Sequence, residues 1–499
     1  MASLSSMPST AGFPAVKSAR DGTDGGPIDE SAQGPVVAFV LSSILWLMLG
    51  SLLGLIASFK LHTPSFFGGI EFLTYGRVHG AKSVALNYGW GFNAAFAVGI
   101  WLMARLSGAR IGKPTLLVIA CVFWNLGGAL GIVGVLAGHG TSLEAIEMPP
   151  YVGPILFGSS VFIAMWGILI FRSRTSPHVY ISQWYLLAAM LWFPWMFSIA
   201  QIMLFVDPAR GTVQSLVHAW YSHGLTLLWF TPIGLAAIYY LLPKLLVKPV
   251  ANYYLCVYGF WPLAIFGGWT GTAALAGGPV PAWVVSAGIA ASLLLAVPIV
   301  VWAVNFFPTM ASAARTLRRD WSYRFVSLGA LCLVLGSASA LILSLRGVSE
   351  VTQFTLIQDA QVQLMSYGFF SMVVFGAIYY ILPRVTDRTW HLPGLIGFHF
   401  WSSFIGCLAS VAILGIAGYN QARALNVVPA GADAIPMALL DIGRTLQPYF
   451  FAQTLALLIL IGGHLVFAVN VVWLLIDRNQ RSTGTANNSL RTPLEAAAR

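Results

Sequence analysis

Charged residues are scarce in this chain of 499 residues. Asp, Glu, Lys and Arg together make up 8% of the sequence, whereas 58% of it is apolar. A soluble domain usually has about a quarter of its residues charged, so the composition excludes a water-exposed globular fold. The formal net charge of +10 comes from basic residues scattered between apolar runs, and we therefore expect no nucleic-acid partner.

Cysteine is also rare, and its four occurrences lie singly within apolar runs. They are Cys121, Cys256, Cys332 and Cys407. No two of them have the short spacing of a metal-binding pair, and an isolated buried cysteine behaves as a small apolar side chain. We interpret all four as packing residues.

Long apolar runs are abundant, and each reaches the roughly 20 helical residues that cross a bilayer. They predict an all-α membrane protein with about twelve transmembrane helices in the lipid bilayer. The predicted helices lie near residues 36–58, 82–104, 115–138, 150–171, 180–206, 214–242, 250–276, 282–306, 325–345, 352–382, 394–418 and 449–476. We expect a twelve-helix domain at 36–478, a disordered N-terminal tail at 1–35 and a polar C-terminal tail at 479–499.

The distribution of basic residues predicts the orientation of the chain. Most Lys and Arg residues fall in the loops on the side of the membrane that holds both ends of the predicted bundle. Positive charge marks the cytoplasmic side of a membrane protein. We therefore expect both termini to be cytoplasmic, in a multi-pass protein of the bacterial inner membrane.

One short motif occurs twice. The sequence IYYLLPK at 238–244 ends the sixth predicted helix, and IYYILPR at 378–384 ends the tenth. Aromatic residues and cations are common at a membrane interface, so the two copies fit convergence. They fit equally an arrangement in which the two helices hold equivalent places in a pseudo-symmetric bundle.

Further motifs lie within or beside the predicted helices. They read FLTYGRVHGAKS at 72–83, VHAWYSHGLTLLWFTPIGLAAIYYLLPK at 217–244, GWTGTAALAGGPVPAW at 268–283, VVFGAIYYILP at 373–383 and FHFWSSFIG at 398–406. In this order they resemble segments of the main subunit (subunit I) of C-type, or cbb-type, haem–copper oxidases. The resemblance covers nearly the whole region of predicted spans and implies the subunit I-like bundle of that family.

The resemblance implies haem b and copper as cofactors, because the family holds two haems and a copper ion with histidine ligands. Aligned with that pattern, this sequence lacks most of the ligands. The haem-ligand positions carry Lys82, Gln361 and Gln363, the copper positions carry His223, Ala273 and Ala274, and the position of a family tyrosine carries Gly267. Only His223 keeps the residue of the family.

We therefore predict a cytochrome c oxidase subunit I-like component of an aerobic respiratory complex that does not reduce oxygen on its own. No catalytic residue and no metal site is assigned, and the expected partners are other respiratory subunits such as a membrane-anchored cytochrome c. One alternative is an active terminal oxidase or nitric oxide reductase relative with shifted haem ligands, for which His79 and Met365 are candidates. Another is a membrane transporter.

Lys82 is the clearest candidate for a residue that replaces the haem as a link between the second and tenth helices. An ionisable residue inside a membrane is costly and normally has a partner. We expect Lys82 to form a hydrogen-bonded bridge with Gln363 and Asp359 between the second and tenth helices, the alternative being that it extends to the interface without a partner. Because protein interiors exclude large voids, aromatic residues should fill part of the haem volume. The candidates are Tyr88, Trp90, Phe92, Tyr367 and Phe369.

Overall fold

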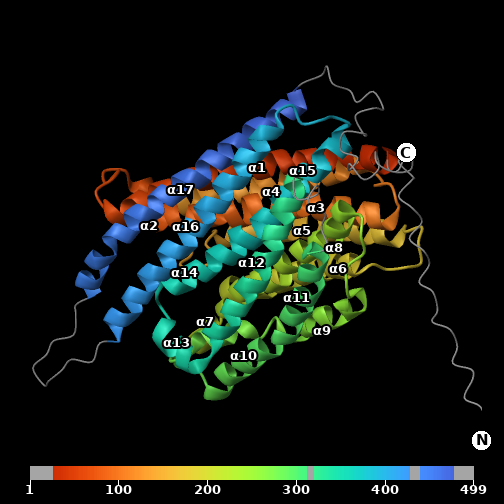
Figure 1. The fold of residues 1–499 in the computed structure, drawn as a ribbon. Coiled ribbons are helices and arrows are strands. Elements are labelled where there is room, and N and C mark those ends of the chain that lie inside the picture. Colours follow the sequence, from red (N-terminus) through yellow and green to blue (C-terminus); the bar gives the residue numbers. More distant parts are fainter. Residues whose placement is uncertain (1–25, 312–319, 427–438, 477–499) are drawn as a thin grey trace, which may run out of the picture.

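The structure is a computed structural model that describes residues 26–311, 320–426 and 439–476. This part of the chain is helical and contains no strand. Ten of its helices are long and apolar enough to cross a membrane. The prediction of an all-α, multi-pass membrane protein is therefore confirmed, and Figure 1 shows the long helices running alongside one another.

The ten spanning helices include five built from single α-helices. These are α1 (Gly26–His62), α4 (Pro114–Leu136), α12 (Trp321–Ser344), α16 (Pro393–Leu425) and α17 (Leu439–Ile476). The other five combine adjacent segments: η3 (Pro150–Val152) with α5 (Gly153–Arg172), α6 (Ile181–Gln201) with η4 (Ile202–Val206), α7 (Thr212–Gly224) with η5 (Leu225–Phe230) and α8 (Thr231–Leu246), α10 (Ala282–Leu294) with α11 (Ala296–Ala311), and α14 (Leu356–Gln363) with η9 (Leu364–Ser371) and α15 (Met372–Thr386).

The remaining two predicted spans are less regular. One is the continuous helix formed by α2 (Tyr75–Val84), η2 (Ala85–Gly91) and α3 (Phe92–Ser107). The other was predicted as one helix at 250–276. It divides into η6 (Tyr253–Leu255), the short α9 (Cys256–Phe266) and the 3₁₀ turn η7 (Thr270–Leu275). A short α13 (Arg346–Thr352) connects α12 to α14, and a 3₁₀ turn η1 (Glu71–Leu73) precedes α2.

The start of the first helix differs from the prediction. We placed residues 1–35 in a disordered tail, but α1 begins at Gly26. The polar start of this helix is stabilised because Asp29 accepts hydrogen bonds from Trp101 and Arg105 on α3. Residues 1–25 and the predicted tail at 479–499 lie outside the described residues.

Both described ends of the chain lie at the same end of the bundle (Figure 1). Asp29 near the start of α1 forms an ion pair with Arg105, and it interacts electrostatically with Arg384 near the end of α15. Arg388, just beyond α15, donates hydrogen bonds to the carbonyl oxygens of Leu474 and Leu475 at the end of α17. This agrees with an even number of spans, and the cytoplasmic orientation of this end stays a prediction.

Four described helices change from α to π geometry, one of them at η4 after α6 and the other three near aligned ligand positions. The π-helical segments η2, η5 and η9 begin at Ala85, Leu225 and Leu364. Each begins within three residues of a position that the family resemblance aligns with a haem or copper ligand, namely Lys82, His223 and Gln363. Wide π turns are rare and are frequent at functional sites.

Candidate functional site

The aligned copper positions are brought together by the contact of η7 with α7. A Cβ atom placed on Gly271 of η7 would lie 3.0 Å from the Cβ of His223 and 2.3 Å from the carbonyl oxygen of Ala219. The backbone of η7 therefore touches the helix that carries His223. Ala273 and Ala274 lie on the same turn, so the three aligned positions share one neighbourhood.

The donor atoms in this neighbourhood do not fit a copper ion. The alanine side chains offer no ligand, and the carbonyl oxygen of Ala274 accepts a hydrogen bond from Gln353 at 2.7 Å. Across the described residues, no three His, Cys, Asp or Glu side chains gather closely enough to hold a metal ion. One imidazole alone supplies too few nitrogens for a copper centre of the family type.

Gly267, the position aligned with the family tyrosine, has little room for a side chain. A Cβ atom on Gly267 would lie 2.5 Å from the carbonyl oxygen of Leu263 and 3.1 Å from a methyl carbon of Leu228. Contacts under 3.0 Å require the structure to move, and here one neighbour is backbone. A tyrosine side chain therefore has no room at this position in the present packing.

Gln361, one of the aligned haem positions on α14, contacts α12. Gln361 donates to the carbonyl oxygen of Gly336 on α12, with 3.4 Å between nitrogen and oxygen. Met365 is buried, and its sulfur lies against the same glycine, 2.5 Å from where a Cβ would stand. The thioether therefore packs on α12, and a haem between the second and tenth helices would need it to turn.

The predicted direct bridge from Lys82 is not formed. Among the described residues, Lys82 has no hydrogen bond or ion pair with Asp359 or Gln363. Its aliphatic stem packs on α1 instead, with its Cδ 3.5 Å from a Cβ placed on Gly54. Lys82 interacts with Asp359 only electrostatically, and likewise with Glu144 and Glu147.

The side chains of Lys82 and His223 are surrounded by protein but are not fully buried. Each lies deep among other atoms, yet Lys82 is partly exposed and His223 is exposed. Asp359 and Ser366 of the tenth helix are exposed as well.

The loop before η3 adds an acidic residue that the sequence analysis missed. Glu147 is 7% exposed and lies under α2, where its Cβ is 3.5 Å from a Cβ placed on Gly80. Its carboxylate accepts from the Ser83 hydroxyl, and one oxygen has no partner among the described residues. Burial raises the pKa of this carboxyl. A lone Glu in a loop beside two prolines gave no sequence signal of such burial.

A pair of tyrosines lies next to this loop. The Tyr88 and Tyr221 hydroxyl oxygens are 2.5 Å apart, and Tyr88 also donates to the carbonyl oxygen of Ala145 at 2.7 Å. The pair joins the second and sixth helices to the loop of Glu147. Each hydroxyl has a hydrogen-bond partner, as buried polar groups normally do.

The two histidines of the eleventh and twelfth helices are held by hydrogen bonds. His464 Nδ1 lies 2.8 Å from the Ser51 hydroxyl, and its Nε2 lies 2.8 Å from the Tyr367 hydroxyl. His399 Nδ1 lies 2.9 Å from the Tyr379 hydroxyl, and its ring stacks on Phe467. Both nitrogens of His464 are occupied, so this residue links α1 to η9 and leaves no nitrogen for a metal.

The aromatic residues expected to fill space are all buried. Trp90 donates to the Ser371 hydroxyl at 3.0 Å and its ring lies 4.8 Å from that of Phe375. Phe92 stacks on Trp229 with ring centres 4.7 Å apart. The exposed fractions of the five predicted residues are 0% for Tyr88, 3% for Trp90, 0% for Phe92, 9% for Tyr367 and 1% for Phe369. That they occupy the volume of a haem stays a prediction.

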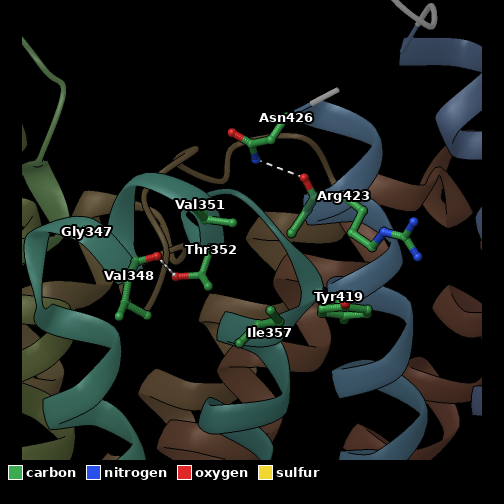
Figure 2. Close-up of a pocket in the computed structure, with 9 residues that line it drawn as sticks. Gly347, Val348, Val351, Thr352, Ile357, Tyr419, Arg423 and Asn426 are labelled. Carbon is green, nitrogen blue, oxygen red and sulfur yellow. Dashed lines mark hydrogen bonds between the residues drawn. The ribbon is translucent and has the colours of Figure 1, made fainter. Parts of the chain in front are cut away.

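A separate surface pocket lies at the end of the bundle away from Asp29, between α13, α14 and α16 (Figure 2). Its lining is mostly apolar, with Tyr419, Arg423 and Asn426 contributed by or near the end of α16. The Thr352 hydroxyl donates to the carbonyl oxygen of Val348, and Asn426 donates to that of Ala422 (Figure 2). These polar groups are satisfied locally, and the pocket has no metal-binding side chain among its lining residues.

This arrangement of helices is that of a haem–copper oxidase main subunit, as the comparison with solved structures shows. A chain of a haem–copper terminal oxidase dimer, solved by cryo-electron microscopy, superposes with a TM-score of 0.68 over 90% of this chain and 85% of its own length. The sequence identity is 12%, so this similarity establishes the fold alone.

The sequence comparisons identify the family. The model of the family described as "Cytochrome C and Quinol oxidase polypeptide I" matches residues 34–459, and the chain belongs to this family. A cytochrome c oxidase subunit 1 homolog of Agrobacterium tumefaciens is 24% identical over 90% of this chain and 85% of its own. The Cbb3-type cytochrome c oxidase subunit CcoN1 of Stutzerimonas stutzeri is 24% identical over 87% and 92%. The resemblance to cbb-type main subunits is confirmed.

Proposed function

We propose that this chain is a non-catalytic, ligand-depleted subunit I-like component of an aerobic respiratory complex in the bacterial inner membrane. The observation that carries the proposal is the donor set at the aligned ligand positions. Lysine and glutamine stand where the family has haem ligands, and alanines stand beside the retained His223. These residues cannot hold two haems and a copper ion, because each haem iron requires an axial ligand and copper requires several nitrogens.

The packing around these positions also supports a non-catalytic, ligand-depleted chain. The closed position of Gly267 and the contact of Gln361 with α12 indicate that the bundle is adapted to the substituted residues. The relatives named as oxidase subunits suggest that the outer surfaces retain a role in assembly. On this basis the partners are other respiratory subunits, such as a membrane-anchored cytochrome c, and the chain carries no haem b or copper of its own.

An active oxidase with shifted ligands is the second candidate. His79 is exposed towards the space beside Lys82, and its Nδ1 lies 3.3 Å from the Tyr75 hydroxyl. It favours this candidate because a modest change of rotamer would free that nitrogen. The packing of Met365 on α12 opposes it, since the tenth helix then offers no ligand opposite His79.

Purification of the tagged full chain from bacterial membranes distinguishes the two candidates. We expect cytochrome subunits to co-purify, identified by mass spectrometry. We expect no difference in oxygen consumption per complex between the wild type and His223→Ala, because His223 belongs to no working metal centre. Oxygen consumption that His223→Ala abolishes in a correctly assembled complex would overturn the proposal, and a chain that purifies without any partner subunit would contradict its role in assembly.

A further inference from the structure

The two copies of the repeated motif meet on a single tryptophan. Trp101 of α3 forms edge contacts with Tyr240 of the first copy, at 5.6 Å between ring centres, and with Tyr380 of the second, at 6.1 Å. The repetition in the sequence therefore corresponds to two helix ends, those of α8 and α15, arranged on either side of α3. The cations that close the motif, Lys244 and Arg384, consequently lie near one another.

Three cations gather at this point, which we call the cationic cluster: Arg105, Lys244 and Arg384. Lys244 interacts electrostatically with both arginines, and the Tyr240 hydroxyl lies in the field of both arginines as well. Like charges held this close repel one another, and at a membrane surface this cost is offset when an anion binds between them.

The acidic groups nearby do not neutralise the cationic cluster. Asp29 is 6% exposed, and its two oxygens are already used by Trp101 at 2.8 Å and Arg105 at 2.6 Å. Asp320 also interacts with Arg384, but its carboxylate caps α12 by accepting from the backbone of Tyr323 at 2.9 Å. Two carboxylates engaged in structural contacts face three cations, so the cluster keeps an excess of positive charge.

Several donors in the cluster lack an acceptor. The Nε of Arg105 is buried and has no partner among the described residues. Arg384 donates to the carbonyl oxygen of Tyr380 at 2.6 Å while its guanidinium lies over that ring, 3.4 Å from the ring centre, and its guanidinium forms no other hydrogen bond within the described part of the chain. Lys244 is exposed, so the cluster can be reached from the end of the bundle.

We propose that the cationic cluster binds a phosphate group, supplied by the headgroup of an anionic phospholipid. Guanidinium groups match the geometry of phosphate oxygens, and a bundle end that holds interfacial Trp, Tyr and basic residues lies at headgroup depth. The phosphate lies at the exposed edge of the cluster, where Lys244 is accessible, and accepts from Lys244, Arg384 and Arg105. A bound lipid thereby joins the ends of α3, α8 and α15.

The test compares lipid retention by the full chain and by variants in which one cation is removed. Native mass spectrometry and titration with fluorescent phosphatidylglycerol in detergent would be applied to the wild type, Lys244→Gln and Arg384→Gln. Arg110→Gln is the matched control, because Arg110 is an exposed cation of the adjoining loop. Each cluster variant should weaken phosphatidylglycerol binding about fivefold, and Arg110→Gln should change it less than twofold.

Two further measurements make the outcome decisive. Phosphatidylcholine should bind more weakly than phosphatidylglycerol, and inorganic phosphate at millimolar concentration should not displace the lipid. Displacement by inorganic phosphate would overturn the lipid as the source of the phosphate group. Equal binding by all variants, or an equal loss in Arg110→Gln, would overturn the site itself. Lys244→Gln keeps the Asp29–Arg105 pair and alters only an exposed side chain, so a folded variant is available.

Discussion

Lys82 shows how a single substituted residue can be accommodated without a direct partner. Its stem packs against α1 at Gly54, and the carboxyl groups of Asp359, Glu144 and Glu147 lie within electrostatic range of its amine. Long basic side chains commonly bury their stems in this way. The charge of a family haem position is therefore tolerated through the surrounding field rather than through a specific bond.

Replacement of Lys82 by methionine tests this account. Methionine preserves most of the contact with Gly54, and no hydrogen bond or ion pair is broken. We expect the free energy of unfolding to change by less than about 1 kcal/mol, measured by denaturation in detergent. A hydrogen-bonded bridge to Gln363 or Asp359 would instead make the substitution cost about 3–5 kcal/mol, as for the loss of one partner of a buried pair.

The hydrogen bonds of His464 are the opposite case, because both ring nitrogens have partners. His464→Phe removes the hydrogen bonds of the imidazole with the Ser51 and Tyr367 hydroxyls, whereas the Tyr367 hydroxyl keeps its bond to Ser403. We expect a loss of about 1–3 kcal/mol of stability. Combined with Tyr367→Phe, the total loss should be smaller than the sum of the two single losses, because the two residues share one bond, although Tyr367→Phe also removes the bond to Ser403. His79→Phe, at an exposed histidine, is the control and should be nearly neutral. Additive losses in the double variant would contradict the shared bond.

Glu147 gives stability a dependence on pH. Burial raises the pKa of the Glu147 carboxyl in the folded state, so folding disfavours its ionised form. Its contribution to stability is fully present below the pKa of the unfolded chain and is lost as the pH rises through the raised folded pKa. Glu147→Gln should therefore be more stable than the wild type at high pH and lose this advantage at low pH. Glu144→Gln in the same loop should follow the wild type, and an advantage of Glu147→Gln that is constant with pH would contradict the burial of a neutral carboxyl.

At the scale of elements, glycines of the second helix set how closely it approaches its neighbours. A Cβ atom on Gly89 of η2 would lie 2.5 Å from the ring of Trp46 on α1, whereas a Cβ on Gly76 meets no atom within 4 Å. We expect Gly89→Ala to cost about 1–3 kcal/mol by overpacking, and Gly76→Ala to be neutral or slightly stabilising. Thermal unfolding of both variants checks this. Equal melting temperatures would show that η2 does not pack on α1 in this way.

The sequence predicted the helices well and their interruptions poorly. Apolar runs of sufficient length identified the spans, since length and composition alone decide whether a helix can cross a membrane. The π segments η2, η5 and η9 could not be predicted from the sequence, because one extra residue in a turn does not alter an all-apolar pattern. The division of the predicted helix at 250–276 follows Gly267 and Gly268, which the apolar composition concealed. The early start of α1 depends on Asp29 meeting Arg105, a contact between segments distant in sequence.

The site was predictable in its residue types but not in its side-chain directions. The order of motifs placed His223 beside the turn of Ala273, as the contact of η7 with α7 agrees. The directions of Lys82 and Gln361 depend on packing against α1 and on a hydrogen bond to α12, contacts between helices that no sequence pattern encodes. Glu147 was missed for the same reason, because its burial results from the fold of a loop under α2.

At the scale of the whole molecule, the chain has the helical bundle of its family, and we propose that the ligand positions within it are altered. The match to the family extends over residues 34–459, and the solved oxidase chain covers 90% of this one. Helix packing by close contacts and aromatic clusters, such as that of Phe92, Trp124 and Trp229, does not require a cofactor. The fold can therefore be retained when the ligands that hold haem and copper are replaced.

The reduced-minus-oxidised visible spectrum of the purified chain, combined with iron and copper analysis, tests the central claim most directly. The chain would be separated from partner subunits and compared with a cbb-type main subunit purified in the same way. The account predicts no haem bands and no stoichiometric copper in this chain, beside strong bands in the control. Haem at one or two equivalents per chain, with bands that respond to reduction, would contradict it.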